Sequence, residues 1–422
     1  MNGKPGKNYT TAFILVTSLF FMWGLSYGLV DVLNKHFQTV LGVTKAQSGF
    51  IQAAYFGAYF VAAVPAALFM NKMGYKAGIM LGLALYAAGA LLFVPATGAM
   101  SFAMFLAALF VLALGLGCLE TAANPYSAAL GDPDTSETRL NLSQSFNGLG
   151  QFVGPLIGGT LFFHGQEGGE KAAHSAGAAA AEAAAGGMES VRLVYVIIAC
   201  VVIGLFALFA RTRLPDLRDS EEEADKHMGT GKRSMASHKE FVFGVVAQLF
   251  YVAAQVGIGA FFINLTLECW PGSTAQQAAY MLSIAMLCLL IGRFTGTGIM
   301  TRVAPSRLLL LYGLVCTVLS VVVFMAVEYV SVVALIATFF FISIMFPTIF
   351  AMGVKNLGSH TKLGSSFMIM AIVGGAIMPY FMGRMADGHS TARAFLLPAC
   401  CFLLVALYAA AYPKLNASSE GA

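Results

Sequence analysis

The sequence predicts an all-α polytopic membrane protein in which twelve transmembrane helices form two related six-helix halves. Of the 422 residues, 58% are hydrophobic and only 10% are charged, with a mean hydropathy of +0.78. This composition is far more apolar than that of a soluble domain. The apolar residues also gather in runs of about 18 or more, the length at which a helix crosses roughly 30 Å of hydrocarbon. Helices are the expected spanning unit because they satisfy their backbone polar groups internally.

Twelve such runs follow one another along the chain. Those of the first half are centred near Ser18, Phe60, Tyr86, Val111, Gly154 and Val201. Those of the second half are centred near Ala253, Leu287, Val315, Phe339, Val373 and Leu403. An even number of spans places both termini on one side, and most of the 24 Lys and Arg residues fall in loops on that side. Cytoplasmic loops are the ones enriched in these residues, so we expect both termini in the cytoplasm.

Two polar stretches interrupt the apolar pattern. Residues 166–188 are rich in Ala and Gly and predict a flexible or loosely helical loop on the outer side. Residues 211–240 contain the acidic run Glu221 to Glu223 and predict a solvated cytoplasmic linker. The linker divides the chain into an N-terminal six-helix bundle, 1–210, and a C-terminal one, 241–422.

Short motifs recur in the same order in both halves. The segment from Pro125 to Gly131 has the same proline-to-glycine spacing as the segment from Pro347 to Gly353. A basic turn also follows the second span of each half, at 72–76 and at 302–307. Parallel repeats of this kind favour alternating access, in which two bundles rock around a site near the middle of the membrane.

Glu120 is an ionisable residue within an apolar span, where such groups are costly and usually functional. It precedes the end of its span at Leu130 by about ten residues, which places it roughly 15 Å deep. Asn124 is four residues further on and shares its helix face. One interpretation is a carboxylate that binds substrate or a proton. The alternative is a protonated Glu that hydrogen-bonds between helices.

Asp31 lies at the end of the first span. If that span stopped at Val30, Asp31 would be an ordinary boundary carboxylate at the outer interface. The apolar residues Val32 and Leu33 instead continue the run, and a buried Asp that gains and loses a proton would be a proton carrier. We expect His36 to be an exposed loop residue.

The fifth span opens with amide side chains that are unusual in a membrane helix. Gln144 and Asn147 are three residues apart, so they share one face, at a depth similar to that of Glu120. Amides donate and accept hydrogen bonds, which suits the hydroxyl groups of a neutral polyol. Interhelical hydrogen bonding is the competing interpretation. We interpret the ridge of Gly150, Gly154 and Gly158 as a packing surface.

Trp23 and Tyr27 in the first span and Tyr251 and Gln255 in the seventh could stack against a sugar ring or hydrogen-bond to it, and simple packing is the alternative. The sequence contains no phosphate-binding loop, paired-cysteine metal site or nucleophile elbow. It therefore predicts neither an enzyme nor an ATP-driven pump, and no cofactor, metal or nucleic acid. The expected partners are a small neutral sugar, H⁺ and membrane lipid, and we expect a monomer.

Three segments, 29–37, 119–126 and 141–148, resemble the fucose:proton symporter family of the major facilitator superfamily, the bacterial group of L-fucose and glucose/galactose permeases. The similarity continues more weakly to about Pro413. The resemblance implies the major facilitator fold, the bacterial inner membrane and proton symport of a neutral hexose or 6-deoxyhexose. It also implies that Asp31 and Glu120 are the family's two membrane carboxylates and that Asn147 and Gln144 line the sugar site.

Three other functions remain open at this point. A facilitative uniporter would keep the sugar site and leave Asp31 without a role. A sugar sensor would bind without transport, and a drug-extruding antiporter would have a large apolar pocket in place of the amide face. Which sugar is carried depends on the placement of single hydroxyl groups, which the sequence leaves open.

Overall fold

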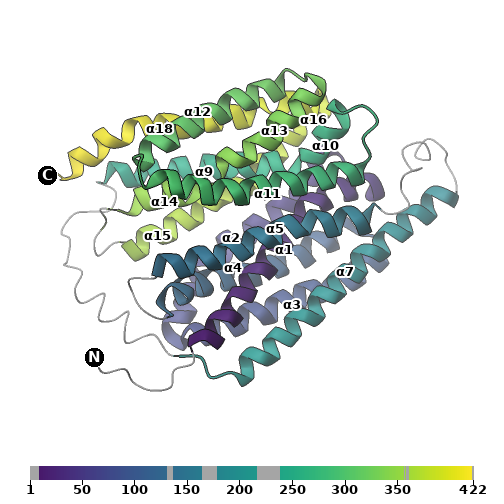
Figure 1. Cartoon of the computed structure of the whole chain (residues 1–422). Coiled ribbons are helices and arrows are strands. Elements are labelled where there is room, and N and C mark those ends of the chain that lie inside the picture. Colours follow the sequence, from purple (N-terminus) through teal and green to yellow (C-terminus); the bar gives the residue numbers. More distant parts are fainter. Residues whose placement is uncertain are drawn as a thin grey trace.

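The computed structural model describes residues 9–130, 136–163, 178–215, 238–355, 357 and 361–420 (Figure 1). The helices of the first half are α1 (Tyr9–Leu41), α2 (Lys45–Met73), α3 (Tyr75–Ala99), α4 (Phe102–Ala129), α5 (Ser136–Phe162) and α7 (Ala178–Arg211). Those of the second half are α9 (Lys239–Ala260), α10 (Phe262–Cys269), α11 (Ala275–Met300), α12 (Pro305–Phe324), α13 (Glu328–Ile342), α14 (Met345–Val354), α15 (Thr361–Met370), η4 (Ala371–Val373), α16 (Gly374–Gly388), α17 (Thr391–Ala394) and α18 (Leu396–Glu420).

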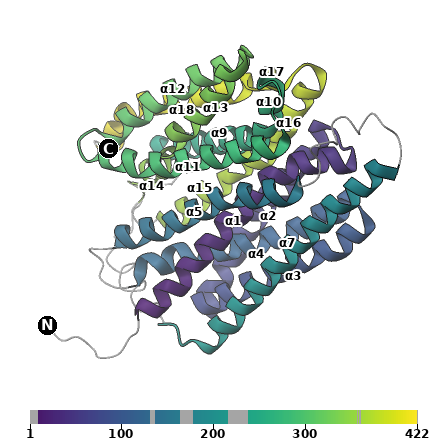
Figure 2. The ribbon, with the colours of Figure 1, turned by 45° about the vertical axis from the view of Figure 1, so that its right-hand side comes forward.

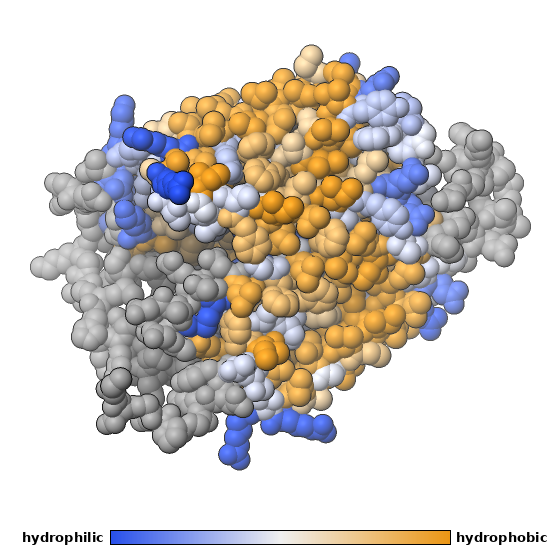
Figure 3. Space-filling model, viewed as in Figure 1, coloured by the Kyte–Doolittle hydropathy of each residue, from blue (hydrophilic) through white to orange (hydrophobic). Residues whose placement is uncertain are grey.

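The described residues contain eleven stretches that are long and apolar enough to cross a membrane. The helix α5 is a twelfth, because its 27 residues are sufficient in length while its polar first turns lower its hydropathy. An apolar band crosses the middle of the face shown in Figure 3, with hydrophilic residues toward both ends. The all-α polytopic fold with twelve spans is therefore confirmed.

The helices pack in two groups, one before and one after the linker (Figures 1 and 2). In the first group α3 packs on α4 and α7, and α1 packs on α5. In the second group α18 packs on α12 and α9, and α13 packs on α11 and α12. The groups meet mainly where α2 lies against α16 and α5 lies against α11. This grouping supports the boundaries 1–210, 211–240 and 241–422, which we retain as a proposal.

Each group has two ends, and the chain alternates between them. We call the end that holds Tyr9, Met73, Arg211 and Lys239 the linker end, and the end that holds Lys45 and Cys269 the far end. Defined caps set several of these boundaries. Thr44 and Gln47 form a capping box at the start of α2, which terminates at Gly74 with a positive φ of 86°, a value that favours glycine. A second capping box, Thr274 with Gln277, begins α11.

Several helices of the second half are interrupted. The break between α9 and α10 lies at Phe261, and the break between α13 and α14 lies at Ser343 and Ile344. The eleventh span passes through the short 3-10 segment η4. Ile344 and Ile372, which lie in two of these interruptions, face the central cavity. Irregular backbone within a membrane span is typical where it lines a cavity.

Three expectations are corrected by the structure. The first span does not end near Asp31, because α1 continues without interruption to Leu41. His36 is consequently not an exposed loop residue: it is fully buried, with its ring 5.4 Å from that of Phe162 and 5.8 Å from that of Phe163. The predicted outer loop is shorter than 166–188, since α7 already begins at Ala178. The part of that loop before Ala178 lies outside the described residues.

Candidate functional site

A cavity of about 1630 Å³ lies between the two groups of helices. Residues from both sides of the linker line it, from Trp23 on α1 to Tyr412 on α18. Its lining includes Gly74 and Tyr75 at the turn after α2, and Pro305 at the turn after α11. These turns lie at the linker end, so the cavity opens there.

A close crossing in the first half brings α1 and α5 together along glycines. A Cβ on Gly154 would lie 2.8 Å from the Cα of Gly28, and one on Gly158 would lie 3.0 Å from a side-chain carbon of Val32. The glycine ridge of α5 is therefore a packing surface, as expected. This crossing places the amide face of α5 directly beside the face of α1 that carries Trp23.

The structure places six of the seven predicted site residues at this cavity. They are Trp23, Glu120, Asn124, Gln144, Asn147 and Gln255. Glu120 is half-buried on α4, and no side chain of the described chain hydrogen-bonds or pairs with its carboxyl group. That group is consequently available to a bound molecule or a proton. The functional roles of all six stay predictions.

The amides form two short hydrogen-bonded series along the wall. Gln144 Nε2 donates to Asn124 Oδ1 at 3.0 Å, and Asn124 Nδ2 donates to the backbone oxygen of Glu120 at 3.1 Å. Gln151 Nε2 donates to Asn147 Oδ1 at 2.7 Å, and Asn147 Nδ2 donates to the backbone oxygen of Phe20 at 3.3 Å. Asn147 thus also joins α5 to α1. The amide face of α5 therefore both lines the cavity and forms hydrogen bonds to neighbouring helices.

The wall formed by the second half adds one group that sequence reasoning missed. Arg293 lies inside α11 and lines the cavity, and its buried Nε has no hydrogen-bond partner among the described residues. Tyr251 lines the cavity beside it and donates to the backbone oxygen of Ile342 at 3.1 Å. The available signal for Arg293 was a lone arginine between Gly292 and Phe294 in an otherwise apolar run.

Asp31 lies apart from the cavity. It is buried, with an exposed fraction of 3%, one helical turn beyond Tyr27, which does line the cavity. On the other side of the interface, a Cβ on Gly259 would lie 2.7 Å from Asp31 Oδ2. The second half therefore covers Asp31. The two carboxylates occupy different compartments: Glu120 faces the open cavity, and Asp31 is enclosed at the closed interface.

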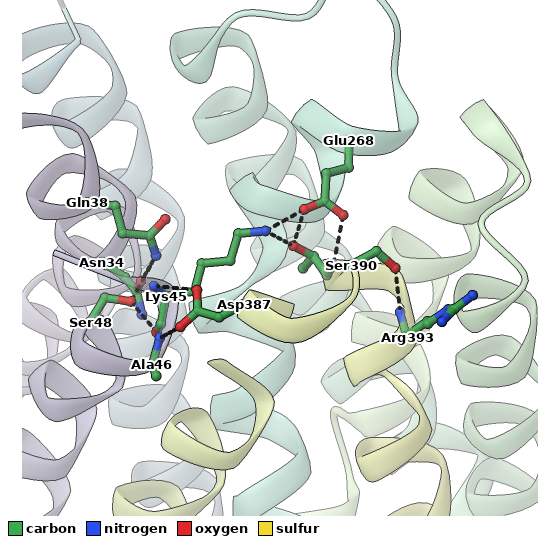
Figure 4. A network of polar contacts seen from close by, with 10 residues as sticks. Asn34, Gln38, Lys45, Ala46, Ser48, Glu268, Asp387, Ser390 and Arg393 are labelled. Carbon is green, nitrogen blue, oxygen red and sulfur yellow. Dashed lines mark hydrogen bonds and ion pairs between the residues drawn. The ribbon is translucent and has the colours of Figure 1, made fainter. Parts of the chain in front are cut away.

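The far end is closed by polar contacts between the halves (Figure 4). Lys45 Nζ pairs with Glu268 Oε1 at 2.6 Å. The Asp387 carboxylate accepts hydrogen bonds from the backbone N–H groups of Lys45 and Ala46, at 3.0 and 2.9 Å, so it caps the start of α2. The backbones also touch, because a Cβ on Gly49 would lie 2.7 Å from the Tyr380 nitrogen.

Comparison with known proteins identifies the family. The model of the Major Facilitator Superfamily matches residues 12–371. The chain belongs to the major facilitator superfamily. Within this superfamily it is 38% identical over 409 residues to the L-fucose-proton symporter of Escherichia coli (strain K12), covering 96% of this chain and 93% of that protein. It is 36% identical over 404 residues to the glucose/galactose transporter of Brucella abortus biovar 1 (strain 9-941), covering 95% and 94%.

Solved structures of the superfamily agree with this assignment. The crystal structure of FucP in the outward conformation has 36% sequence identity and a TM-score of 0.71, covering 96% of this chain and 99% of that one. The inward open xylose transporter XylE from E. coli has a TM-score of 0.72 at 11% identity and 96% coverage of each chain, a likeness of fold alone. This superfamily member is a membrane transporter and not an enzyme.

Proposed function

We propose that this protein imports a neutral hexose or 6-deoxyhexose together with a proton, by alternating access across a bacterial inner membrane. The observation that carries the proposal is the cavity between the halves, open at the linker end and closed at the far end by Lys45, Glu268 and Asp387. A site that is accessible from one side only is what alternating access requires.

The sugar class is supported by the composition of the cavity wall. Gln144, Asn124 and Gln255 bring amides that can both donate to and accept from hydroxyl groups, and Trp23 offers an aromatic face. The relatives named as an L-fucose-proton symporter and a glucose/galactose transporter support the same class. L-fucose, glucose and galactose are the leading candidates.

Proton coupling is supported by the separate positions of the two carboxylates. Water that enters the cavity from the linker end reaches Glu120. Asp31 stays enclosed until the far end opens and Gly259 withdraws from it. A proton taken up at one face can therefore be released at the other when each carboxylate, in turn, is exposed. We propose that Asp31 and Glu120 both take part in this exchange.

The proposed orientation, with the linker end in the cytoplasm, is supported by the bias of Lys and Arg residues toward the loops of that end. Two exposed methionines allow a test: Met100 lies at the far end and Met73 at the linker end. In a cysteine-free background, Met100→Cys should react with an impermeant thiol reagent in intact cells. Met73→Cys should react only after the membrane is permeabilised, and the reverse pattern would refute the orientation.

The transport proposal is tested by uptake into proteoliposomes of labelled L-fucose, glucose, galactose and a pentose, with and without an inwardly directed proton gradient. Symport predicts that the gradient drives accumulation of one of the hexoses above the external concentration. A second candidate is a facilitative uniporter, favoured by the position of Asp31 outside the cavity. Equilibration that ignores the gradient would establish the uniporter, and no hexose transport would reject both.

A further inference from the structure

A continuous series of hydrogen-bonded polar side chains runs from the far end toward Asp31. Gln38 Nε2 donates to Ser48 Oγ at 2.8 Å and to Asn34 Oδ1 at 2.7 Å. Asn34 Nδ2 then donates to Gln52 Oε1 at 3.1 Å. Ser48, Asn34 and Gln52 are fully buried, and Figure 4 shows the Asn34, Gln38 and Ser48 part of the series beside Lys45. We call Gln38, Asn34 and Gln52 the amide series.

The direction of the hydrogen bonds in the amide series is set at its outer end. Ser48 Oγ gives its one proton to the backbone oxygen of Lys45 at 2.8 Å, so toward Gln38 it can only accept. Gln38 must therefore turn its NH₂ group to Ser48 and to Asn34. Asn34 consequently accepts on its oxygen and donates to the oxygen of Gln52. The free inner end of the series is an N–H donor, Gln52 Nε2.

The register of α1 against α2 places that donor beside Asp31, because Tyr27 lies against Phe56 at 6.0 Å between ring centroids on one side and Asn34 bonds Gln52 on the other. Gln52 Nε2 and Asp31 Oδ2 are both buried, and neither has a hydrogen-bond partner among the described residues. Around Asp31 the described helices place Tyr27 from α1, Gln52 from α2 and Gly259 from α9, and of these only Tyr27 is titratable. An unpaired donor and an unpaired carboxyl oxygen therefore share one small enclosure.

A donor aimed at a carboxyl group favours its ionised form, because a hydrogen bond to a charged acceptor is about twice as strong as one to a neutral acceptor. We propose that Gln38, Asn34 and Gln52 are positioning residues for proton coupling. They hold a donor beside Asp31 that favours the loss of its proton toward the cavity, whose lining begins one helical turn away at Tyr27, while the far end is closed. The proposal rests on the proposed symport.

The geometry also indicates what changes when the far end opens. Both helices of the amide series, α1 and α2, belong to the first half, so the series moves as a unit. The groups that leave are on the second half: Gly259, which covers Asp31, and Asp387, which caps the first turn of α2 beside Ser48. Water then reaches Asp31 from the far end, so the carboxyl group can exchange a proton with the outside.

The test compares Gln52→Met, which removes the donor at similar side-chain volume, with Gln248→Met as a matched control. Gln248 is an equally buried amide on α9 that lies outside the cavity lining and the amide series. Sugar exchange without net proton movement and gradient-driven accumulation are measured in proteoliposomes between about pH 5 and 9. Gln52→Met should retain exchange, lose part of its accumulation, and shift the midpoint of the pH profile upward by about one to two units, since Asp31 would keep its proton to higher pH.

Gln38→Met acts at the partly exposed outer end of the series, where it leaves the enclosure around Asp31 intact. It frees Asn34 and Gln52 to reverse their amides, so it should shift the midpoint in the same direction by a smaller amount. Wild-type midpoints in both variants, with exchange intact, would overturn the inference. A wild type that exchanges sugar but ignores the proton gradient would instead refute the proposed symport, and the inference with it.

Discussion

Asp31 on α1 and Gly259 on α9 face each other across the two halves so closely that a Cβ on Gly259 would lie 2.7 Å from Asp31 Oδ2. Atoms at that separation overlap, so the closed far end depends on the absence of a side chain at position 259. The same contact separates Asp31 from water at the far end while the cavity is open at the linker end. Closure of the far end and the access of water to the Asp31 carboxyl group thus both depend on the contact between Asp31 and Gly259.

Gly259→Ala should therefore shift the protein toward the state with an open far end. Overpacking of a buried contact costs about 1 kcal/mol or more, which corresponds to roughly a fivefold change in the ratio of open to closed molecules. Cys269, buried on α10 at the far end, can report this change by its labelling rate when the other cysteines are replaced. Gly298→Ala is the control, because a Cβ there meets nothing within 4 Å. Equal labelling in wild type and Gly259→Ala would contradict the prediction.

The contacts that close the far end should differ in strength. Lys45 and Glu268 keep 26% and 32% of their side-chain surface exposed, and ion pairs of this kind contribute about 0 to 1 kcal/mol. Asp387 caps a helix through two backbone N–H groups, which contributes about 0.5 to 2 kcal/mol. Asp387→Ala should therefore accelerate the labelling of Cys269 more than Lys45→Met does. If Lys45→Met accelerated the labelling more than Asp387→Ala, the ion pair of Lys45 with Glu268 would be the stronger contact that closes the far end.

The fold was predictable because its signals are local. Each span can be recognised from the length of its own apolar run. Even α5, with its polar first turns, was recognised from the run around Gly154. The course of α1 beyond Leu33 was not recognised, because Asn34, Lys35 and His36 look like a loop when the burial of Asn34 and His36 is unknown. Tertiary packing turned these polar residues into part of a helix.

The site was predictable in part for a related reason. A polar side chain in an apolar span costs free energy, so it is usually there for a function. This reasoning identified Glu120 and Gln144 from the sequence. Arg293 was overlooked because the Thr and Gly residues that follow it resemble the end of a span. The pairing of Lys45 with Glu268 depends on how the two halves meet, across 223 residues of chain, and no local pattern encodes it.

Asp31→Asn removes the group that we propose to exchange the coupled proton. The variant keeps a polar side chain of similar size, so the enclosure formed by Gln52 and Gly259 should persist. We expect the proton gradient to stop driving accumulation, while exchange of labelled for unlabelled sugar continues, because exchange needs no net proton movement. Both activities are measured in the same proteoliposomes. Accumulation at the wild-type level in Asp31→Asn would exclude this residue as the coupling group.

Glu120 and Asn147 should contribute unequally to sugar binding. Glu120 presents to the cavity a carboxyl group that no described side chain engages, whereas both ends of the Asn147 amide are already used, by Phe20 and Gln151. A hydrogen bond from a sugar to a charged carboxylate contributes about 1.5 to 3 kcal/mol, and one to a neutral amide about 0.5 to 1.5. Glu120→Gln should therefore weaken binding by more than about tenfold, and Asn147→Ala by less.

The measurement is equilibrium binding of the transported sugar to purified variants. Asn147→Ala also removes a bond between α5 and α1, so its thermal stability must be compared with that of wild type before its affinity is interpreted. Loss of stability with normal affinity would assign Asn147 to helix packing and leave the sugar to Glu120 and Gln144. If Glu120→Gln and Asn147→Ala both bind the sugar as wild type does, the sugar site lies on another part of the cavity, and the opposite wall around Arg293 and Gln255 becomes the place to search.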